Sequence, residues 1–582
     1  MTTEAYVRDQ RFEPLLMGVR FPDGTGTWVP QERLREFFAS YDLSKFAVLA
    51  HHAHFDGLIL SHHLGQRPAF WFDTLSMARL ILGNHVPAGL ESLAKHFDLP
   101  AKTVPYSMFD GKVWANLYES EREALGQGSM HDCNLTWEIF TKLAQGFPPR
   151  EYKVIDTLVR MFTEPKLEAD LTLLSEITTE EIHKKHVLLN ELGVSEEDLQ
   201  SSAKFVELLQ NEGVEVEYKG GKNGPIPAIA KTDDFMKGLV DDENDRVATL
   251  AQARLEVRST IAQTRAGRLA NMGSRGALCV YLKPYGAHTT RVSGADALNF
   301  TNFPGGHRSR LRSAVVAPRG YLIATVDSAQ GECRILNTLA GQTDILEAFR
   351  AKRDIYSENA SRFYGHPVNK QEHPKQRHLG KVQELMLGFG AGAERFQATC
   401  RAGALGGPPI LLTDVEAESA VAQYRNDHPF VVNYWKTAGR MLARIAGGEP
   451  LAWGPFVVET GKVTLEGVSL VYNDMRFNAD DYEGWSYRSR SGRARIWGSK
   501  LVENLVQFAH RMAVWEQIQT IERESKLPLV LHSYDDASFL IPDDQWAEQT
   551  LAWLCEKFRK APAWLADCPF DSDGVIGRTY DK

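Results

Sequence analysis

"LHSYDDASFL", from Leu531 to Leu540, is an apolar, strand-like run that is interrupted by an aromatic residue and two adjacent carboxylates. Two neighbouring like charges raise the free energy unless a cation, a water-exposed turn or a reaction compensates them. Asp535 and Asp536 are therefore either an ordinary solvated turn or part of a charged site. Other segments of the chain help to decide between these two interpretations.

A second strand-like run, far earlier in the chain, also ends in a carboxylate. The segment YLIATVDSAQGECRIL begins at Tyr321, and its apolar half ends at Asp327, before a half that is compatible with a helix. A carboxylate at the C-terminal end of a strand points into the crevice where such sheets bind ligands. If the two strands are neighbours, Asp327 and Asp535 can share divalent cations, and a pair of metal ions is a standard device for phosphoryl transfer. Taken one at a time, each acid is more simply a solvated turn residue.

A third stretch, RHLGKVQELMLGFGAG, lies between the two acids. Arg377 and Lys381 are four residues apart, so they share one face of the predicted helix, and Leu385 and Phe389 continue the stripe. A guanidinium and an ammonium on one face suit a triphosphate, and the aromatic ring further along suits a base. The alternative is a solvated helix face.

Three basic stretches, RSTIAQTRAGRL, GHRSRLRS and YRSRSGRARIWGSK, alternate cations with Ser, Thr and Gly. Such residues can follow a phosphate backbone through charge, hydroxyls and close backbone approach. Solubility alone is the competing explanation for each single stretch. Their cations are Arg258, Arg265, Arg268, Arg308, Arg310, Arg312, Arg488, Arg490, Arg493, Arg495 and Lys500.

The composition is that of an ordinary globular protein. Of 582 residues, 43% are hydrophobic and 24% are charged, and the net charge is -9, so any nucleic-acid partner must be held by local patches. Six cysteines form no CxxC pair, which suits a reducing cytoplasm and argues against a zinc ribbon. No apolar run approaches the ~18 residues that a membrane span needs.

The hydrophobic pattern predicts several domains of mixed type. Residues 1–145 alternate short apolar runs with helical stretches, and residues 151–270 are helical apart from a Gly/Pro-rich loop, EYKGGKNGPIPAIAK. Residues 277–294 are predicted to be rich in strands, and residues 340–450 to be helical. The C-terminal part returns to strands around one long helix, so the two strand-rich parts are expected to form one discontinuous domain.

At this point the sequence resembles the family A DNA polymerases, the bacterial DNA polymerase I group, in a bacteriophage-type version. The family motif D-Y-S-Q-I-E-L-R appears as DSAQGECR from Asp327 to Arg334. The motif R-x3-K-x7-Y-G appears with its spacing from Arg377 to Gly390, and H-D-E appears as the tripeptide YDD that begins at Tyr534.

Supporting stretches of the same resemblance run in order from about residue 255 to the C-terminus. TTRVSGADALNFTNFP resembles the family's T-G-R-x-S…N-L-Q-N-I-P run and places Arg291 and Asn302. VENLVQFAHR resembles the helix whose glutamine, here Gln507, reaches the minor groove of the primer–template. With Arg265 and Arg268, these residues are the predicted DNA contacts.

The resemblance implies a role for each matched position. Asp327 and Asp535, with the backbone carbonyl of Ser328, would hold two Mg²⁺ ions, for which Mn²⁺ is an alternative. Asp536 would match the family's less essential glutamate, with a side chain one carbon shorter. Lys381 would join these acids in the catalytic set, and it would bind the triphosphate together with Arg377.

The remaining predicted nucleotide contacts also come from the resemblance. Phe389 would pack beside the templating base, and Glu332 would crowd the sugar 2′ position so that deoxynucleotides are preferred. Leu385 stands where the family usually has Phe or Tyr against the incoming sugar, and Tyr534 replaces the usual histidine. Gln330 matches the family's glutamine.

The N-terminal third resembles the family's 3′–5′ exonuclease domain, but the match is incomplete. HHAHFDG resembles the second exonuclease motif and gives Asp56, with His52 in the place of an asparagine. MHDCNLTWEIF resembles the third motif and gives Asp132, but Gly128 or Gln127 stands where a tyrosine or histidine is expected. The first motif, D-x-E, is absent, so either the chain starts late or this version has lost proofreading.

The predicted fold is α/β and α+β, with an RNase H-like exonuclease domain followed by a right-hand polymerase. The expected domains are an exonuclease-like domain at 1–145, a helical thumb at 146–275, the palm at 276–345 and 466–582, and the fingers at 346–465. The expected function is template-directed DNA synthesis on primer–template DNA with dNTPs, for phage genome replication, with weak or no proofreading. The alternatives are a non-catalytic DNA-binding subunit of the same fold and a 3′–5′ exonuclease.

The resemblance also gives expectations about the setting of the protein. A monomer in the cytoplasm is expected, which is the host cytoplasm if the chain is phage-encoded. Replication accessory proteins are expected partners, and a membrane is not.

Overall fold

The computed structural model describes residues 1–221, 224–231, 233–240, 242, 244–258, 261–303, 310–403, 407–479 and 484–580, apart from the side chains of residues 258 and 261. Arg308 and the side chain of Arg258, from the predicted basic stretches, therefore lie outside the described part. The chain divides into two compact units. The first comprises Met1–Leu167, Cys279–Gly305 and Ala317–Lys582, and the second comprises Glu168–Leu278 and Gly306–Val316.

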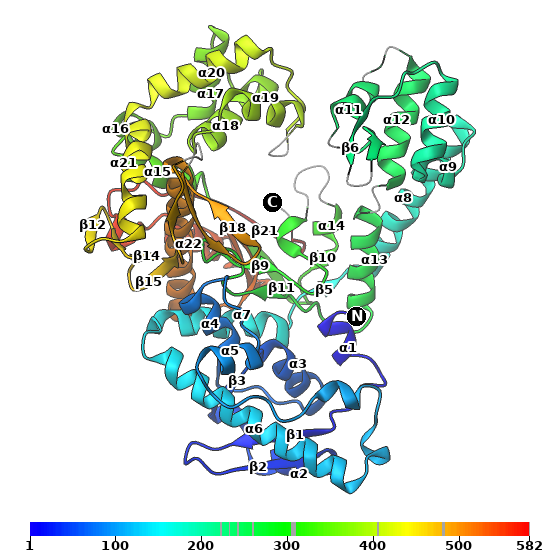
Figure 1. Ribbon diagram of the computed structural model, residues 1–582, viewed down its shortest axis with the longest axis vertical. Helices are drawn as coiled ribbons and strands as arrows, with labels where there is room; N and C mark the ends of the chain where they lie inside the picture. The colour runs from blue at the N-terminus through cyan, green and yellow to red at the C-terminus, as the bar shows by residue number, and fades with distance from the viewer. Residues whose placement is uncertain are drawn as a thin grey trace. The chain divides into compact units, whose positions relative to one another are not determined.

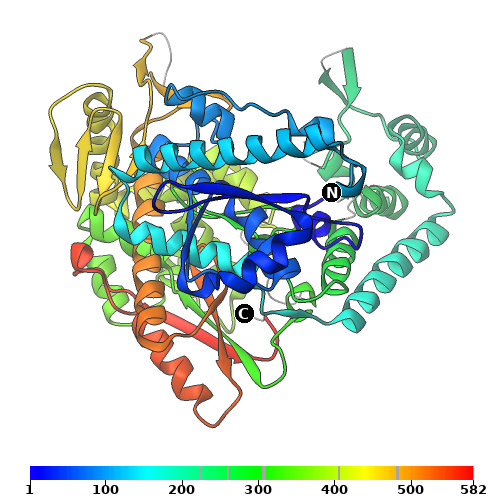
Figure 2. The same ribbon diagram turned by 90° about the horizontal axis from the view of Figure 1, so that it is seen from below.

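The N-terminal part of the first unit contains two separate two-stranded sheets. Strands β1 (Leu16–Arg20) and β2 (Gly26–Pro30) form an antiparallel hairpin, whereas β3 (Ala47–Ala50) and β4 (Phe70–Asp73) pair in parallel. The long helix α6 (Glu119–Ala144) contacts β1, β2 and β3 (Figures 1 and 2). Among the described residues, no strand joins the two pairs into one sheet.

Close packing of α6 on the β1–β2 hairpin depends on glycine. A Cβ atom on Gly18 would lie 2.4 Å from the Ser129 hydroxyl, and one on Gly126 would lie 2.4 Å from the Trp28 ring. Because real side chains do not approach so closely, both positions need glycine for the helix to lie flat on the hairpin.

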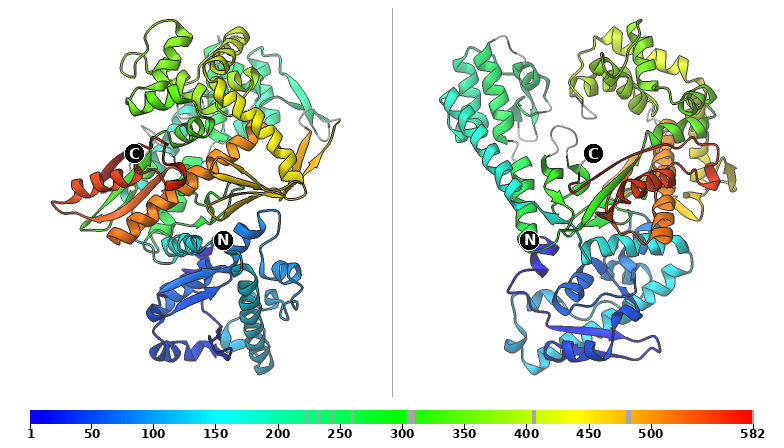
Figure 3. Two further views of the ribbon diagram at one scale, coloured as in Figure 1. Left: turned by 90° about the vertical axis from the view of Figure 1, so that its left-hand side faces the viewer. Right: turned by 180° about the vertical axis from the view of Figure 1, so that it is seen from behind.

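A four-stranded antiparallel sheet forms the centre of the first unit. Its strand order is β19 (Leu529–Ser533), β20 (Asp536–Pro542), β11 (Tyr321–Ser328) and β21 (Ser572–Gly577). Helix α23 (Ala547–Phe558) packs against β11 and β21 (Figure 3). β11 and the C-terminal strands, which are far apart in the sequence, thus share one sheet, as the expectation of a discontinuous strand-rich domain requires.

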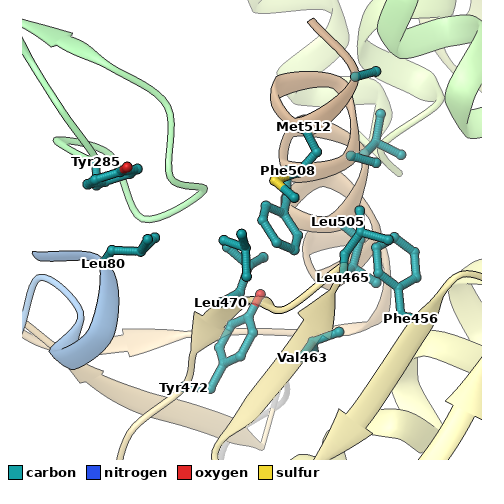
Figure 4. Packing of buried hydrophobic residues seen from close by; sticks show 14 of the residues in the cluster. Leu80, Tyr285, Phe456, Val463, Leu465, Leu470, Tyr472, Leu505, Phe508 and Met512 are labelled. Atoms are coloured by element: carbon teal, nitrogen blue, oxygen red, sulfur yellow. The ribbon is translucent and has the colours of Figure 1, made fainter. Parts of the chain in front are cut away.

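The main hydrophobic core joins the 28-residue helix α22 (Gly498–Ser525) to a second antiparallel sheet. That sheet consists of β12 (Leu451–Trp453), β13 (Phe456–Glu459), β14 (Lys462–Leu465) and β15 (Val468–Val471). Figure 4 shows the packing: Phe456, Leu465 and Leu470 lie against Leu505 and Phe508 of α22. The core extends to Leu80 of α4 (Thr74–Leu82), so part of the N-terminal region packs on the same core as α22. A separate small cluster of Trp114, Leu117 and Leu125 lies beside the β1–β2 hairpin.

A group of helices occupies the segment between β11 and this second sheet (Figure 1). Its members are α15 (Gly331–Ala340), α16 (Thr343–Arg350), α17 (Ile355–Tyr364), α18 (Pro374–Leu387), α19 (Ala393–Arg401), α20 (Asp414–Asp427) and α21 (Pro429–Ala446). The small core of α18, α19 and α20 includes Leu379, Phe396 and Tyr424. The predicted helical character of residues 340–450 is confirmed.

The second unit is mainly helical and has a core of its own. Its helices are α8 (Leu171–Leu192), α9 (Glu196–Gln200), α10 (Ser202–Asn211), α11 (Asp234–Val240), α12 (Asp245–Arg258), α13 (Ile261–Gly273) and α14 (Arg310–Ser313). Buried residues of this core include Phe205, Met236 and Leu250. Strands β5 (Glu168–Ala169) and β10 (Val315–Val316) pair where the two parts of the unit meet.

Two local predictions are wrong. The segment EYKGGKNGPIPAIAK is not a plain loop, because β6 (Tyr218–Gly221) pairs with β7 (Gly224–Pro227) as a hairpin. Residues 277–294 hold only the two-residue strands β8 (Leu282–Lys283) and β9 (Ser293–Gly294) among the described residues. Left-handed backbone at Tyr285 and Thr290 interrupts the extended run, and alternation of residue types did not reveal these turns.

None of the described helices combines the length and apolar character that a membrane crossing needs.

Candidate active site

Asp327 and Asp535, the two predicted metal ligands, lie at one end of the central sheet. Asp327 is the penultimate residue of β11, and its direct neighbour in the ladder to β20 is Asp536. Asp535 lies in the two-residue turn between β19 and β20, and its backbone oxygen accepts a hydrogen bond of 2.8 Å from the Ser328 amide. The condition that the two strands be neighbours is met by the pairing of β11 with β20.

The two adjacent aspartates of the turn have different surroundings. Asp536 is buried, with 2% of its surface exposed, and its Oδ1 accepts a hydrogen bond of 3.1 Å from the Ser533 amide. Its backbone oxygen also lies 2.8 Å from Nδ1 of His532. Asp535 is only half-buried. The geometry therefore commits Asp536 to closing the turn and leaves Asp535 more open to a ligand.

Ser328, next to Asp327, is held by a residue of α22. Its hydroxyl lies 3.0 Å from Nε2 of the buried His510. A Cβ atom on Gly331 would lie 2.2 Å from the same nitrogen, so glycine is needed for this approach. Since β11 ends at Ser328, the contact fixes the strand end that carries Asp327 to α22.

Arg291 and Glu332, from two separate segments, form an ion pair beside the acids. The Arg291 guanidinium also lies 5.5 Å from the centre of the Tyr534 ring. Burial lowers the pKa of Arg291 to about 10, although the charge of Asp535 opposes this shift. A predicted DNA contact, the predicted sugar-selecting acid and the predicted metal ligand therefore lie together.

Helix α18 brings in the predicted triphosphate-binding residues. The Arg377 guanidinium donates to both carboxylate oxygens of Asp354, at 2.5 and 3.1 Å, and lies 5.3 Å from the centre of the Tyr356 ring. Lys381 lies one turn further along and is half-buried. A hydrogen bond between Tyr356 and Gln330, the residue before α15, links this group to the end of β11.

Leu385 and Phe389 lie at the far end of α18. Leu385 is half-buried, and Phe389 follows the helix and packs against the main core. Gly390 has a φ of 78°, and a Cβ atom there would lie 2.4 Å from the Ser499 hydroxyl. The glycine after Phe389 is thus required by both backbone conformation and space.

The predicted DNA contacts are distributed over both units. Gln507 of α22 is half-buried, and its Oε1 accepts a hydrogen bond of 3.3 Å from the Thr289 hydroxyl. Asn302 is exposed at the end of a 3₁₀ turn that begins at Phe300. Arg265 and Arg268 lie on α13, which belongs to the second unit.

The oxygen donors at the end of β11 suit a hard cation. Asp327 and Asp535 offer carboxylates, and Ser328 offers a backbone carbonyl. In the described ranges, no group of three His, Cys, Asp or Glu side chains is arranged to hold a metal ion. Mg²⁺ is commonly bound by one or two carboxylates and completes its shell with water and substrate phosphates. Zinc prefers nitrogen and sulfur ligands, which this donor set lacks.

Comparisons with known proteins agree with this geometry. The model of DNA polymerase family A matches residues 169–445. The chain is 25% identical to a DNA polymerase of Bacillus phage SP02 over 289 residues, which are 47% of this chain and 43% of that protein. It is 32% identical to the thermostable DNA polymerase I of Thermus filiformis over 296 residues, which are 50% of this chain and 31% of that protein. Over residues 169–445 the chain is therefore similar to DNA polymerase family A.

A solved structure extends the family A likeness to nearly the whole fold. The polymerase domain of Pol1 from M. smegmatis, in complex with DNA primer-template and dNTP, matches with a TM-score of 0.70 at 18% identity. The match covers 98% of this chain and 93% of that chain. The curated relatives of family A, by contrast, are matched over less than half of their own length.

The N-terminal acids Asp56 and Asp132 lie near one another but are constrained by neighbours. Burial raises the pKa of the Cys133 thiol to about 12, and the charges of Asp56 and Asp132 add to the shift, so both acids lie near that thiol. Lys102 forms an ion pair of 2.8 Å with Asp132. Nε2 of His52 lies 2.7 Å from the Tyr281 hydroxyl, so the residue in the asparagine position contacts another segment.

Several residues at these sites were missed by the sequence argument. His510 stands in the VENLVQFAHR stretch but was given no role, and Asp573, the other ladder neighbour of Asp327, belongs to no motif that had been recognised. Tyr106 lies at the N-terminal site, where a Cβ atom on Gly128 would lie 3.4 Å from its hydroxyl. A tyrosine from a different segment therefore reaches the neighbourhood where one was expected at residue 128. Spatial convergence of this kind leaves no signal in residue spacing.

Proposed function

We propose that this chain is a DNA-directed DNA polymerase, which adds dNTPs to the 3′-hydroxyl of a primer by two-metal phosphoryl transfer. The observation that carries the proposal is the ladder between β11 and β20, which joins Asp327 to the Asp535–Asp536 turn. A purely structural sheet gains nothing from like charges at one strand end, because their repulsion needs a compensating cation. The similarity of residues 169–445 to DNA polymerase family A supports the same chemistry.

The proposed role of each residue follows from its contacts. Asp327 and Asp535, with the Ser328 carbonyl, would hold the two Mg²⁺ ions, which would supply an activated hydroxyl and charge neutralisation on the triphosphate. Arg377 and Lys381 would orient the phosphates. Their guanidinium and ammonium groups provide donors and positive charge but no acceptors, which matches a polyphosphate and not a cation.

Other residues of the site are proposed to select the sugar and the base. Glu332 would exclude a 2′-hydroxyl, and its ion pair with Arg291 would keep the carboxylate in place. Phe389 would stack near the templating base, and Leu385, Gln330 and Tyr534 would complete the pocket. Gln507 and Asn302 would contact the primer–template, as would Arg265 and Arg268 from the second unit.

The proposed domains are an exonuclease-like domain at 1–145, the thumb at 146–275, the palm at 276–345 and 466–582, and the fingers at 346–465. The N-terminal domain would have weak or no proofreading activity. Two observations support this: its described strands form two separate pairs, and Lys102 neutralises Asp132. A role in phage genome replication is supported by the similarity to the polymerase of Bacillus phage SP02. Six free cysteines, five of them buried, suit the reducing cytoplasm.

Primer extension with a labelled primer–template, Mg²⁺ and the four dNTPs tests the proposal. The expected result is templated extension that depends on the divalent ion. Binding without extension would favour the DNA-binding subunit, and shortening of the primer would favour the exonuclease.

A further inference from the structure

A buried polar network lies beneath the helix that carries the proposed phosphate ligands. Glu384 of α18 has 2% of its surface exposed, and three side chains from other segments converge on its carboxylate. Its Oε1 accepts a hydrogen bond from the Asn359 amide of α17, and its Oε2 lies 3.3 Å from the Cys333 thiol of α15. His428, between α20 and α21, places Nε2 3.4 Å from Oε1.

The surroundings of His428 favour its doubly protonated form. Nδ1 lies 3.0 Å from the Tyr424 backbone oxygen, which accepts only, so this nitrogen donates. Nε2 faces the carboxylate of Glu384 at ion-pair distance. Burial alone would lower the pKa of His428, but the charge of Glu384 outweighs burial and raises the pKa above its ordinary value.

The charged and titratable groups around His428 all come from neighbouring helices. Glu384 faces it from α18, and the Tyr424 ring stacks on it with 4.0 Å between ring centres. Asp427 adds a smaller favourable charge and is itself paired with Arg362 of α17 at 3.2 Å. Cys333 of α15 contacts the far side of the Glu384 carboxylate. The Glu384–His428 pair is therefore enclosed by α15, α17 and α20.

The position of Glu384 on α18 gives this pair a functional consequence. It follows Arg377 by seven residues, which is close to two helical turns, so the two side chains leave the same side of the helix. Fixing Glu384 therefore fixes the rotation of α18 about its axis. That rotation determines where Arg377 and Lys381 point.

We propose that Glu384 and His428 form a positioning pair, which orients α18 so that Arg377 and Lys381 face the triphosphate of the incoming nucleotide. The proposal rests on the polymerase function proposed above. The pair touches neither substrate nor the reacting atoms, so it acts only through the two cations. Its loss should therefore weaken nucleotide binding more than DNA binding.

The chain contains a matched control for a purely structural effect. Glu151 of α7 (Pro149–Thr163) and Arg511 of α22 form an equally buried ion pair of 2.5 Å, which Tyr285 completes. This pair lies away from α18, between other elements. Breaking either buried pair should lower the Tm, but only the pair on α18 should change the handling of dNTP.

The experiment compares wild type with Glu384→Gln, His428→Gln and the control Glu151→Gln in single-nucleotide incorporation. Glu384→Gln and His428→Gln should each raise the KM for dNTP about tenfold, which corresponds to ~1.4 kcal/mol. The Kd for primer–template should stay within twofold of the wild-type value. This limit corresponds to about 0.5 kcal/mol, the size of effect expected from substitutions away from a site. Glu151→Gln should lower the Tm and leave the KM for dNTP unchanged.

A pH series separates positioning from packing. Because the folded pKa of His428 is raised, the pair is intact at low pH and is lost as pH rises through that pKa. The KM for dNTP of the wild type should therefore increase towards alkaline pH more than that of Glu384→Gln, in which the pair is already broken. In the DNA-free protein, hydrogen exchange of α18 should be faster in Glu384→Gln and in His428→Gln than in wild type. This measurement does not depend on activity.

The proposal would be overturned if Glu384→Gln and His428→Gln kept the wild-type KM, or if Glu151→Gln raised the KM equally. It would also be overturned if exchange of α18 were unchanged in the variants. Failure of wild-type protein to extend a primer would instead overturn the proposed function, and the exchange measurement would still report whether the pair holds α18.

Discussion

At the scale of single residues, the site is built around unusual backbone. Tyr534 and Gln330, which precede Asp535 and α15, both have left-handed φ values, of 54° and 55°. Such a conformation is costly for residues other than glycine and persists where the surroundings enforce it. At Tyr534 it turns Asp535 out of the ladder while Asp536 remains in it. The backbone thus separates two carboxylates that the sequence presents as a pair.

Glu332→Ala tests the proposed selection of the sugar. Removing the carboxylate should allow a 2′-hydroxyl, so the preference for dNTP over rNTP should fall about tenfold or more, since steric exclusion by a small group discriminates on this scale. The measurement is kcat/KM for a matched dNTP and rNTP. Glu332→Gln keeps the bulk and should retain most of the preference. An unchanged ratio in Glu332→Ala would remove Glu332 from this role.

At the scale of secondary-structure elements, buried ion pairs connect segments that are distant in sequence. Glu151 joins α7 to α22 through Arg511, and Glu384 joins α18 to three neighbours. Neither pair could be predicted from the sequence, because Glu151, Glu384 and Arg511 each stand in a helix with several other charged residues, and spacing does not show which of those charges is buried. Both acids resembled ordinary solvated residues until the structure showed their burial.

Glu151→Gln should lower the stability of the protein at neutral pH by about 3 kcal/mol or more, because it leaves the Arg511 charge buried without its partner. Burial opposes ionisation of Glu151, but the charge of Arg511 outweighs it and lowers the pKa of Glu151 below its ordinary value. The stabilisation is therefore present above the unfolded-state pKa and is lost as pH falls below it. Thermal unfolding from neutral to acidic pH checks this. Wild type and variant should converge at low pH, and a constant difference would contradict the assignment.

The elements themselves were largely predictable where the pattern was long and periodic. α22 and the strands β11, β19 and β20 appear where apolar runs predicted them. Residues 277–294 were predicted wrongly because a run rich in β-branched and aromatic residues was taken for strands, whereas left-handed residues turn the chain there. The pairing of Asp327 with Asp573 was missed because β21 lies near the C-terminus in a short segment without a recognised motif.

At the scale of the whole molecule, the charge distribution bears on the proposed binding of DNA. The net charge is -9, so attraction to DNA must come from local groups such as Arg488 and Arg490, which are exposed around the end of strand β17 (Trp485–Ser489). Replacing both with Gln should reduce the slope of log K against log [salt] by about 1–2, as expected when one or two phosphate contacts are lost. Fluorescence anisotropy of a labelled primer–template over a salt series measures the slope. An unchanged slope would show that these residues do not contact the backbone.

The N-terminal region is expected to contribute little proofreading. Without dNTPs, the protein should not shorten a labelled primer in the presence of Mg²⁺, because Asp56 and Asp132 alone do not form a complete two-metal site. The variant with both Asp56→Ala and Asp132→Ala should behave as wild type does. Shortening that the double variant abolishes would show that the region is an active nuclease.

The central claim is that Asp327 and Asp535 hold the metal ions for nucleotide transfer. Single-turnover incorporation at saturating Mg²⁺ tests it most directly, with Asp327→Asn, Asp535→Asn and Asp573→Asn compared. Asp573 is the matched control because it is the other ladder neighbour of Asp327 and is exposed on β21. The account predicts that Asp327→Asn and Asp535→Asn lose about a thousandfold or more in rate, equivalent to ~4 kcal/mol of transition-state stabilisation. Both variants should still bind primer–template, and the rate of Asp573→Asn should stay near that of wild type. Near-normal rates in Asp327→Asn or Asp535→Asn would contradict it.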